Sequence, residues 1–355
     1  MFYVDALVHQ GRSLTIPYAG YQHFLPRLAA FFATAFDPAW APSVTTAIAF
    51  GLLLFVLARL LSDRVLLPHR PWLALALILA PDAREVFFNL ANLQWVLALG
   101  LMVLLLASDA QTRLSRFLDV AFAAAAGLTG PFSPLLAPLF VFRAWQRRSL
   151  MAVTIAVVML ATAAVQAWFL WHAPADGAAA AASVRWSIIP SLIGFRLGVL
   201  PLLGGLAPPP GASPWLALAG LLVLAAVVLL ARQAYAAGRG LLAAGFALLL
   251  AAVLFRCRHF HADLLVAGAG ERYFFILEVL LLWLLLAAGA SGKGWLIATR
   301  AIFLTFVLLN LPAFQLSPFT NYHWADYARE IRAGRACSFP VNPPGMTINC
   351  PALPR

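Results

Sequence analysis

Apolar residues in this chain come in long, nearly unbroken blocks, and few polar side chains interrupt them. A helix of about 20 apolar residues is long enough to cross the hydrocarbon core of a bilayer. The pattern therefore predicts an all-α fold, a polytopic transmembrane helical bundle with about eight full spans. The predicted spans are residues 43–61, 71–80, 92–107, 150–171, 215–231, 240–255, 273–290 and 296–312, of which 71–80 is the shortest.

Two further apolar segments are broken by proline and glycine. Residues 117–142 contain "GLTGPFSP", and residues 192–214 read "LIGFRLGVLPLLGGLAPPPGASP". Because proline and glycine interrupt helices, the first segment predicts two short half-helices that meet at a bend. The second predicts an interfacial or re-entrant piece. Irregular backbone at membrane depth persists only where protein or water satisfies its polar groups.

The spans divide the chain into three parts. Residues 1–42 are predicted to form an outer loop and an interfacial helix, residues 43–312 the bundle, and residues 313–355 an extracytoplasmic tail. Arginines that follow the first span and flank the 117–142 segment are typical of cytoplasmic loops. The predicted outer segments carry about as many arginines as the inner ones. Either this topology is wrong or the outer arginines have a function, and the regular alternation of spans favours the second interpretation.

Composition narrows the functional classes. Only 10% of residues are charged, against roughly 25% in soluble domains. The net charge of +11 comes almost wholly from arginine, since Lys293 is the only lysine. A soluble chain this basic would suggest nucleic acid, but here we expect no nucleic-acid partner. Membrane lipids and phosphate groups are the expected anions, because the planar guanidinium suits phosphate.

The densest polar cluster is "RCRHFHAD", residues 256–263. Arg256, Arg258 and His259 are predicted to hold a phosphate or diphosphate by charge-assisted hydrogen bonds. A charge-tolerant loop, or contact with anionic headgroups, is the alternative. A metal site at His259, His261 and Asp263 would need more donors than the sequence offers, so no metal ligand is assigned. A divalent ion is compatible with the chemistry, but no residue pattern requires a cofactor.

Arg272 opens the next span, and Glu278 lies about 9 Å further along the same helix at 1.5 Å per residue. An acid at that depth usually faces the bundle interior or a water-filled cavity. We expect Arg272 to bind substrate and Glu278 to line the cavity. The alternative for Glu278 is an ion pair with an arginine on a neighbouring helix.

"PDAREVFFNLANLQW", residues 81–95, places acids and amides just before a span. Glu85 is a candidate general base towards a hydroxyl, and Asn89 and Asn92 are candidates to bind sugar hydroxyls. Helix capping is the alternative: Asp82 suits an N-cap, with Glu85 as its capping-box partner. Capping is the preferred interpretation of Asp82, and the role of Glu85 stays open.

Near the start, "PYAGYQHFLPRLAAFF" carries His23 and Arg27 four residues apart, on one face of a helix. This face is predicted to contact headgroups and phosphate while Phe24, Leu28, Phe31 and Phe32 enter lipid. Ordinary interfacial snorkelling is the alternative.

The tail predicts a short amphipathic helix with Asn321 as N-cap and Gly334 at C′. Cys337 and Cys350 bracket a proline-rich loop, and two cysteines this close predict a disulfide in an oxidising compartment. Such a disulfide would require the tail to lie outside the cytoplasm.

Several stretches together resemble a group of bacterial multi-spanning proteins: "GRSLTIPYAGYQHFLPRLAA", "REVFFNLANLQWVLAL", "GLTGPFSPLLAPLF" and "ERYFF…LLLW". Their layout is similar to that of GT-C glycosyltransferases, which take sugars from polyprenyl-phosphate carriers on the outer face. The resemblance implies a first transmembrane helix, then an outer loop with an acidic residue or pair, then an interfacial helix. Asp5 is the only acid left in that region. Either Asp5 takes the catalytic role, or the chain begins at an internal methionine and lacks the first helix, which is the favoured expectation.

The leading hypothesis is therefore a glycosyltransferase of the bacterial inner membrane, a multi-pass protein of the cell envelope. It would move a sugar from a polyprenyl-phosphate donor to a glycan or lipid acceptor, with Asp5 or Glu85 as the base. Arg256, Arg258 and Arg272 would stabilise the departing phosphate. The alternatives are a transporter or flippase of a lipid-linked or anionic solute, and a non-catalytic assembly subunit.

Overall fold

The protein is described by a computed structural model covering residues 1–81, 85–173, 184–204, 207, 211–232, 237–315, 320–342 and 345–353. Within these residues the fold is helical apart from one short two-stranded sheet. Six helical stretches are long and apolar enough to cross a membrane. They are Pro38–Leu61, Leu150–His172, Pro214–Arg232, Gly238–Arg256, Arg272–Ser291 and Lys293–Asn310.

These six helical stretches coincide with six of the eight predicted spans. The other two, residues 71–80 and 92–107, form α4 (Arg70–Ile78) and α5 (Leu93–Leu106), with 9 and 14 residues. Both are shorter than the roughly 20 residues of a full crossing. The structure thus supports a multi-helix bundle with six helices of spanning length, and a count of eight stays a prediction.

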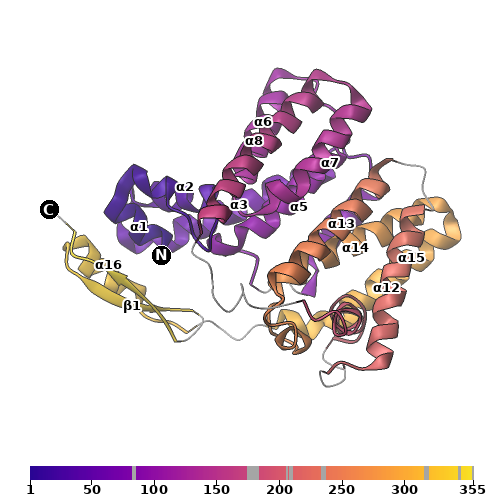
Figure 1. The fold of residues 1–355 in the computed structure, drawn as a ribbon. Coiled ribbons are helices and arrows are strands. Elements are labelled where there is room, and N and C mark those ends of the chain that lie inside the picture. Colours follow the sequence, from indigo (N-terminus) through magenta and orange to yellow (C-terminus); the bar gives the residue numbers. More distant parts are fainter. Residues whose placement is uncertain are drawn as a thin grey trace.

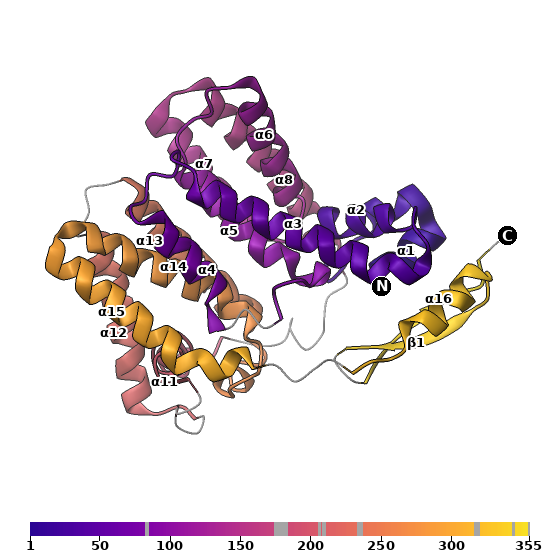
Figure 2. The same ribbon diagram turned by 180° about the vertical axis from the view of Figure 1, so that it is seen from behind.

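The remaining long helices are α3 (Ala41–Leu61), α6 (Arg113–Gly127), α7 (Phe132–Arg147), α8 (Leu150–His172), α12 (Pro214–Arg232), α13 (Ala237–Arg256), α14 (Arg272–Ala288) and α15 (Lys293–Asn310). Figure 1 shows α6, α7 and α8 as one column, and α12 to α15 as a second group. Seen from behind, α4 lies beside α14 of the second group, in agreement with the packing contacts between these two helices (Figure 2).

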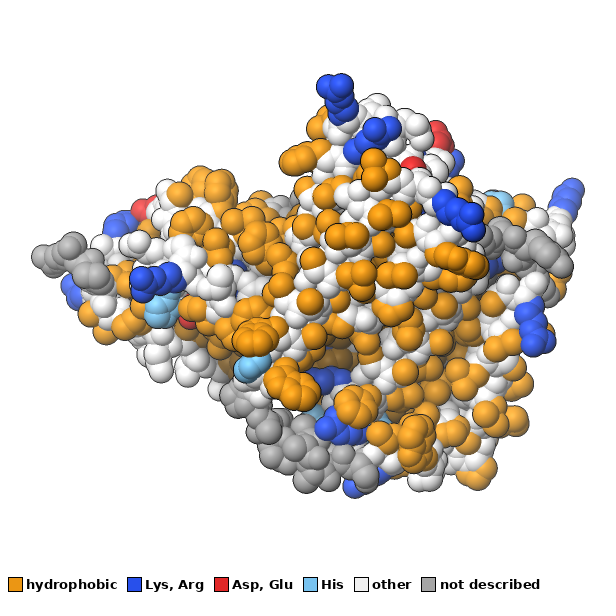
Figure 3. Space-filling view, turned by 45° about the horizontal axis from the view of Figure 1, so that its top comes forward, with side chains coloured by type: hydrophobic (Ala, Val, Ile, Leu, Met, Phe, Trp, Pro, Cys, Tyr) orange, Lys and Arg blue, Asp and Glu red, His pale blue; other side chains and the backbone are white. Residues whose placement is uncertain are grey.

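The core lies around α5 and α14. Every residue of α5 is buried, and 78% of the apolar window of α14 is buried, against 22% for α12. Apolar side chains cover most of the bundle surface in Figure 3, with Lys and Arg mainly at its margins. Leu222, Leu308 and Trp171 are 62%, 65% and 86% exposed. Such an apolar outer surface suits contact with lipid rather than with water.

The predicted bend in the 117–142 segment is confirmed, since α6 ends at Gly127 and α7 begins at Phe132. The two helices have 15 and 16 residues, so each is about 22–24 Å long, more than a half-span. Another segment of the protein, rather than water alone, provides hydrogen-bond partners for the backbone of the bend. The Gly130 amide donates to the Gln22 carbonyl at 2.9 Å, and the Phe24 amide to the Leu128 carbonyl at 3.1 Å.

The 192–214 segment is mostly helical where it is described, in α10 (Ile189–Gly194), a π-helical turn (Phe195–Val199) and α11 (Leu200–Leu203). Gly194 and Gly220 let this run approach α12 closely. A Cβ added at Gly194 would lie 1.9 Å from the Leu216 carbonyl oxygen, so no side chain fits there. Buried Arg196 joins the run to the α13–α14 loop by donating to the Leu264 carbonyl at 2.6 Å.

The start and the tail pack together on one side of the bundle (Figure 1). The start comprises α1 (Phe2–His9) and α2 (Phe24–Ala33). The tail comprises α16 (Trp324–Arg332) and the antiparallel strands β1 (Cys337–Val341) and β2 (Met346–Cys350). Val4, Ile331, Phe339 and Cys350 form their shared core.

Two details of the tail differ from expectation. His323, not Asn321, is the N-cap of α16, although the Asn321 side chain accepts from the His323 amide at 2.9 Å. The stretch between the cysteines, predicted as a loop, is a β-hairpin because apolar Phe339, Val341 and Ile348 alternate with polar or exposed positions. Gly334 does take the predicted C′ position, with φ of 70°.

Candidate functional site

A cavity of about 2010 Å³ opens among α1, α3, α5, α7, α13, α14 and the hairpin tip. Much of its wall is apolar, and the lining residues include Leu53, Leu57, Leu135, Leu249 and Ile276. Along α3 the lining runs from Pro42 to Leu57, which corresponds to about 22 Å of helix. A cavity with an apolar wall of this length suits an alkyl or isoprenoid chain.

The mouth of the cavity is polar and charged. Glu85 and Arg272 both line it, and Arg272 Nη1 donates to Glu85 Oε2 at 2.6 Å. These two side chains are 46% and 38% exposed, so the ion pair is open to water and ligands. The structure thus brings together two residues that lie 187 positions apart, and both were predicted for the site. Arg272 also lies over the Tyr273 ring at 5.2 Å.

Arg256 lies at the same mouth, at the end of α13. Its side chain is exposed, and none of the described residues forms an ion pair or hydrogen bond with it. Glu271, which precedes Arg272, also lines the mouth. The cavity entrance therefore carries two guanidinium groups beside two carboxylates, with Arg256 available to an external anion.

Asn89 and Asn92 line the cavity as predicted, but each is partly engaged in local structure. Asn89 Oδ1 accepts from the Ala91 amide at 3.0 Å, which caps the short helix Leu90–Asn92. Asn92 Nδ2 donates to the Glu85 carbonyl at 2.7 Å. These contacts hold the Glu85 segment in place. Asp82 and its proposed capping role lie outside the described residues.

The "RCRHFHAD" cluster does not act as one unit, which corrects the prediction. Arg256 reaches the cavity, but Arg258 lies over the Phe255 ring at 4.4 Å and donates to the Phe255 carbonyl. His259 packs edge-on against Phe260, and neither Arg258 nor His259 lines the cavity. Arg256 is the last residue of α13, whereas Arg258 and His259 lie in the turn that follows it.

His23 and Arg27 are buried, each 1% exposed, so they do not face headgroups as predicted. Arg27 binds Asp5 at 3.1 Å and lies over the Phe2 ring at 5.1 Å. The rings of Phe2, Tyr18 and Tyr21 surround His23 at 4.8–5.6 Å. Burial, and secondarily the charge of Arg27, lower the pKa of His23 from 6.5 to about 4. His23 is therefore neutral and lies behind the aromatic residues of the cavity wall.

On the same helix Leu28, Phe31 and Phe32 are 38%, 36% and 54% exposed, and Phe24 is half-buried. Their entry into lipid stays a prediction. Asp5 does not line the cavity, and its carboxylate is held by Arg27. Of the two candidate bases, only Glu85 faces the chamber. Glu278 is 2% exposed and does not line the cavity either, which corrects its predicted place.

Several residues that line the cavity were not predicted from the sequence. Tyr18, Tyr21, Gln94, Trp95 and Tyr273 line the wall next to the charged mouth. Trp95 packs against Phe132 and Tyr273 with ring centroids 5.3 and 5.7 Å apart. In the sequence, only the position of Gln94 and Trp95 pointed to the site: they end the run of polar residues that precedes the apolar part of α5.

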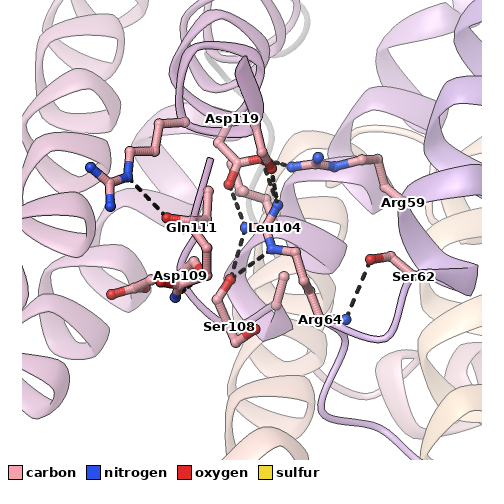
Figure 4. A network of polar contacts seen from close by, with 12 residues as sticks. Arg59, Ser62, Arg64, Leu104, Ser108, Asp109, Gln111 and Asp119 are labelled. Atoms are coloured by element: carbon pink, nitrogen blue, oxygen red, sulfur yellow. Dashed lines mark hydrogen bonds and ion pairs between the residues drawn. The ribbon is translucent and has the colours of Figure 1, made fainter. Parts of the chain in front are cut away.

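The opposite end of the bundle, here called the arginine face, holds Arg59, Arg64, Asp119 and Arg143. Figure 4 shows Asp119 between Arg59 and Arg64, and Arg64 also donates to the Ser108 carbonyl at 2.8 Å. Arg143 donates to the Leu104 and Ala107 carbonyls at the end of α5. Asp119 is 1% exposed. These arginines serve the protein's own carbonyl and carboxylate groups.

No group of three or more His, Cys, Asp or Glu side chains that could hold a metal ion is found among the described residues. Comparisons with protein-family models, with characterised proteins and with solved structures found no match to this chain. The case for a function therefore comes from the cavity itself.

Proposed function

We propose that the protein is a membrane glycosyltransferase that uses a lipid-phosphate sugar donor at the mouth of this cavity. One observation carries the proposal: Arg256, Arg272 and Glu85 line the same cavity of about 2010 Å³ as a long apolar wall, which follows α3 for about 22 Å. An amphiphile with an anionic head and a long apolar chain matches both parts. The six helices of spanning length support a location in a membrane, here proposed to be the bacterial inner membrane with the cavity facing outward.

Arg256 and Arg272 would hold the donor phosphate. A guanidinium fork forms paired, charge-assisted hydrogen bonds to phosphate oxygens. Two such groups equal the two negative charges of a diphosphate diester and exceed the single charge of a phosphodiester. As the bond between the sugar carbon and the phosphate oxygen breaks, the phosphate keeps the electron pair. Positive groups already in place stabilise that growing charge without reorganisation.

Glu85 would accept the proton of the attacking acceptor hydroxyl. Its carboxylate is bound to Arg272 at 2.6 Å, so a phosphate that binds Arg272 competes for the same donors and releases Glu85 for proton transfer. Asp5 is the weaker candidate because it is paired with buried Arg27 away from the cavity. Asn89 and Asn92 keep a role in positioning the Glu85 segment.

The test uses the purified full chain in lipid nanodiscs with radiolabelled polyprenyl-phosphate sugars and a mixture of glycan and lipid acceptors. We expect label in a new product, loss of that product in Glu85→Gln by at least about 100-fold, and weaker donor binding in Arg272→Gln. Asp326→Asn, on the exposed side of α16, is the matched control and should keep full activity.

Two results would overturn the proposal. Movement of a fluorescent lipid-phosphate carrier between leaflets without transfer would assign the protein to the transporters or flippases. Retention of transfer by Glu85→Gln would remove Glu85 from the mechanism.

A further inference from the structure

The β-hairpin of the tail connects a cysteine pair to the cavity. In the antiparallel register, Cys337 faces Cys350, Phe339 faces Ile348, and Val341 faces Met346. Residues two apart in a strand lie on the same face, so these three pairs form one row. The row begins with the cysteines at the open end and ends at the tip.

The two ends of this row have different environments. At the tip, Val341, Asn342 and Met346 line the cavity. At the open end, Cys350 is 2% exposed and belongs to the core shared with Val4, Ile331 and Phe339. The hairpin is therefore held at its base by α1 and α16, while its tip forms part of the cavity wall.

The geometry of the register suits a disulfide. Directly opposed residues of an antiparallel pair have Cα atoms about 4.5–5.5 Å apart, inside the range of about 4.4–6.8 Å that a disulfide bridges. Both sulfur atoms lie on the same face of the sheet, because directly opposed side chains share a face. In the structure both cysteines are free thiols, placed opposite each other by the register.

We propose that Cys337 and Cys350 form a disulfide in the mature protein, and that this bond fixes the hairpin tip as a wall of the cavity. The two thiols lose two protons and two electrons, and a disulfide oxidant of the extracytoplasmic compartment is reduced to its dithiol. The bond closes the hairpin at the end opposite its turn, so that neither strand separates from the other. The inference depends on the cavity and the register, not on glycosyl transfer.

Other contacts fix where the closed hairpin sits. Trp324 Nε1 donates to the Pro38 carbonyl at 2.9 Å, Arg332 pairs with Asp37, and Trp324 packs edge-on against Phe339 at 5.2 Å. These bonds tie α16 to the segment before α3, whose first residues Pro42 and Thr45 also line the cavity. With the disulfide formed, these contacts hold the hairpin tip at the cavity entrance.

The first experiment counts thiols in protein isolated from its native membrane without reductant, by alkylation with a polyethylene-glycol maleimide in denaturant. Denaturant is needed because Cys350 and Cys257 are 2% and 0% exposed in the folded protein. The chain has three cysteines, so we expect a shift of one before reduction, from Cys257, and a shift of three after reduction. Peptide mass spectrometry should recover residues 337 and 350 in one linked fragment. A shift of three before reduction would overturn the proposal.

The second experiment tests the consequence for the cavity. Amide hydrogen exchange of oxidised and reduced protein should differ most in β1 and β2, at least about tenfold faster after reduction, because local opening is then less costly. The Cys337→Ala/Cys350→Ala variant should match the reduced protein and show that the effect comes from the bond. Equal exchange in oxidised and reduced protein would contradict the structural role. Neither measurement uses transfer activity, so failure of the glycosyltransferase proposal leaves this test intact.

Discussion

The two ends of the bundle use arginine in opposite ways. On the arginine face, Arg59 and Arg64 both pair with the buried Asp119 carboxylate, and Arg143 caps the carbonyl groups at the end of α5. At the cavity mouth, Arg256 is exposed and without a described partner, and Arg272 holds Glu85 in an open ion pair. The same residue type thus stabilises the fold at one end and is available to an external anion at the other. The bonding partners and the exposure of an arginine, not its residue type, distinguish a structural role from a binding role.

The Asp119→Asn variant tests the structural role of the arginine face and should have the largest effect on stability. This variant removes the negative charge between two arginines in a site only 1% exposed, and unfolding should become easier by about 3–5 kcal/mol. Denaturant titration in mixed micelles measures the change. Asp63→Asn is the matched control, because Asp63 is 97% exposed and its pair with Arg70 is screened by water. Equal effects of the two variants would show that burial of Asp119 does not matter.

A second test concerns His23, which lies behind the cavity wall. Its pKa is about 4 in the folded protein and 6.5 when unfolded, so only the unfolded state gains a proton between these values. Stability is full above pH 6.5 and falls as pH drops towards 4, by about 3 kcal/mol in total. His23→Phe should keep the aromatic packing and flatten this dependence. Thermal unfolding between pH 4 and 7 is the measurement, and His259→Phe, at an exposed histidine, is the control. If stability depends on pH as steeply in His23→Phe as in the unmodified protein, His23 is not the group that causes the dependence.

Arg143→Gln tests the capping of α5. Loss of the guanidinium leaves the Leu104 and Ala107 carbonyls short of donors in a buried site, at a cost of about 1–3 kcal/mol. The denaturation assay used for Asp119 applies. Arg148→Gln is the neighbouring control, since Arg148 follows α7 at its C-terminal boundary and the described residues show no side-chain bond to it. A stability equal to that of the unmodified protein would contradict the capping role.

Arg256→Gln should have the smallest effect on stability and a clear effect on ligand binding. Because no described residue pairs with Arg256, unfolding should stay within about 0.5 kcal/mol of the unmodified value. Binding of a long-chain lipid phosphate should weaken by about tenfold, the loss of roughly one charge-assisted hydrogen bond. Nanodisc binding at two salt concentrations measures it. A large loss of stability with unchanged binding would place Arg256 with the arginines of the opposite face.

Local patterns of sequence predicted much of the architecture. The lengths of the apolar blocks predicted about eight spans, of which six are helices of spanning length, and "GLTGPFSP" predicted the break between α6 and α7. Glu85 and Arg272 were both selected for the site, because charges beside long apolar blocks are costly without a role. The pairing between them was not predicted, since 187 residues separate them.

Other site residues were misplaced for reasons that only packing reveals. His23 and Arg27 lie on one helix face, as their spacing required, but that face meets α1 and its aromatic rings instead of lipid headgroups. Arg258 and His259 are neighbours of Arg256 in sequence, but they lie in the turn after α13 and do not line the cavity. Tyr21 and Trp95 gave no signal beyond ordinary aromatic composition.

What the sequence alone determined was the set of apolar helices, their breaks and the position of charge near their ends, because these depend on short-range patterns and on the length of chain that crosses a bilayer. What only the tertiary structure decided was which charged groups have protein partners. A guanidinium is the same group at Arg143 and at Arg256. Its surroundings, brought together from distant segments, fix whether it binds a carbonyl of its own chain or remains open at a cavity.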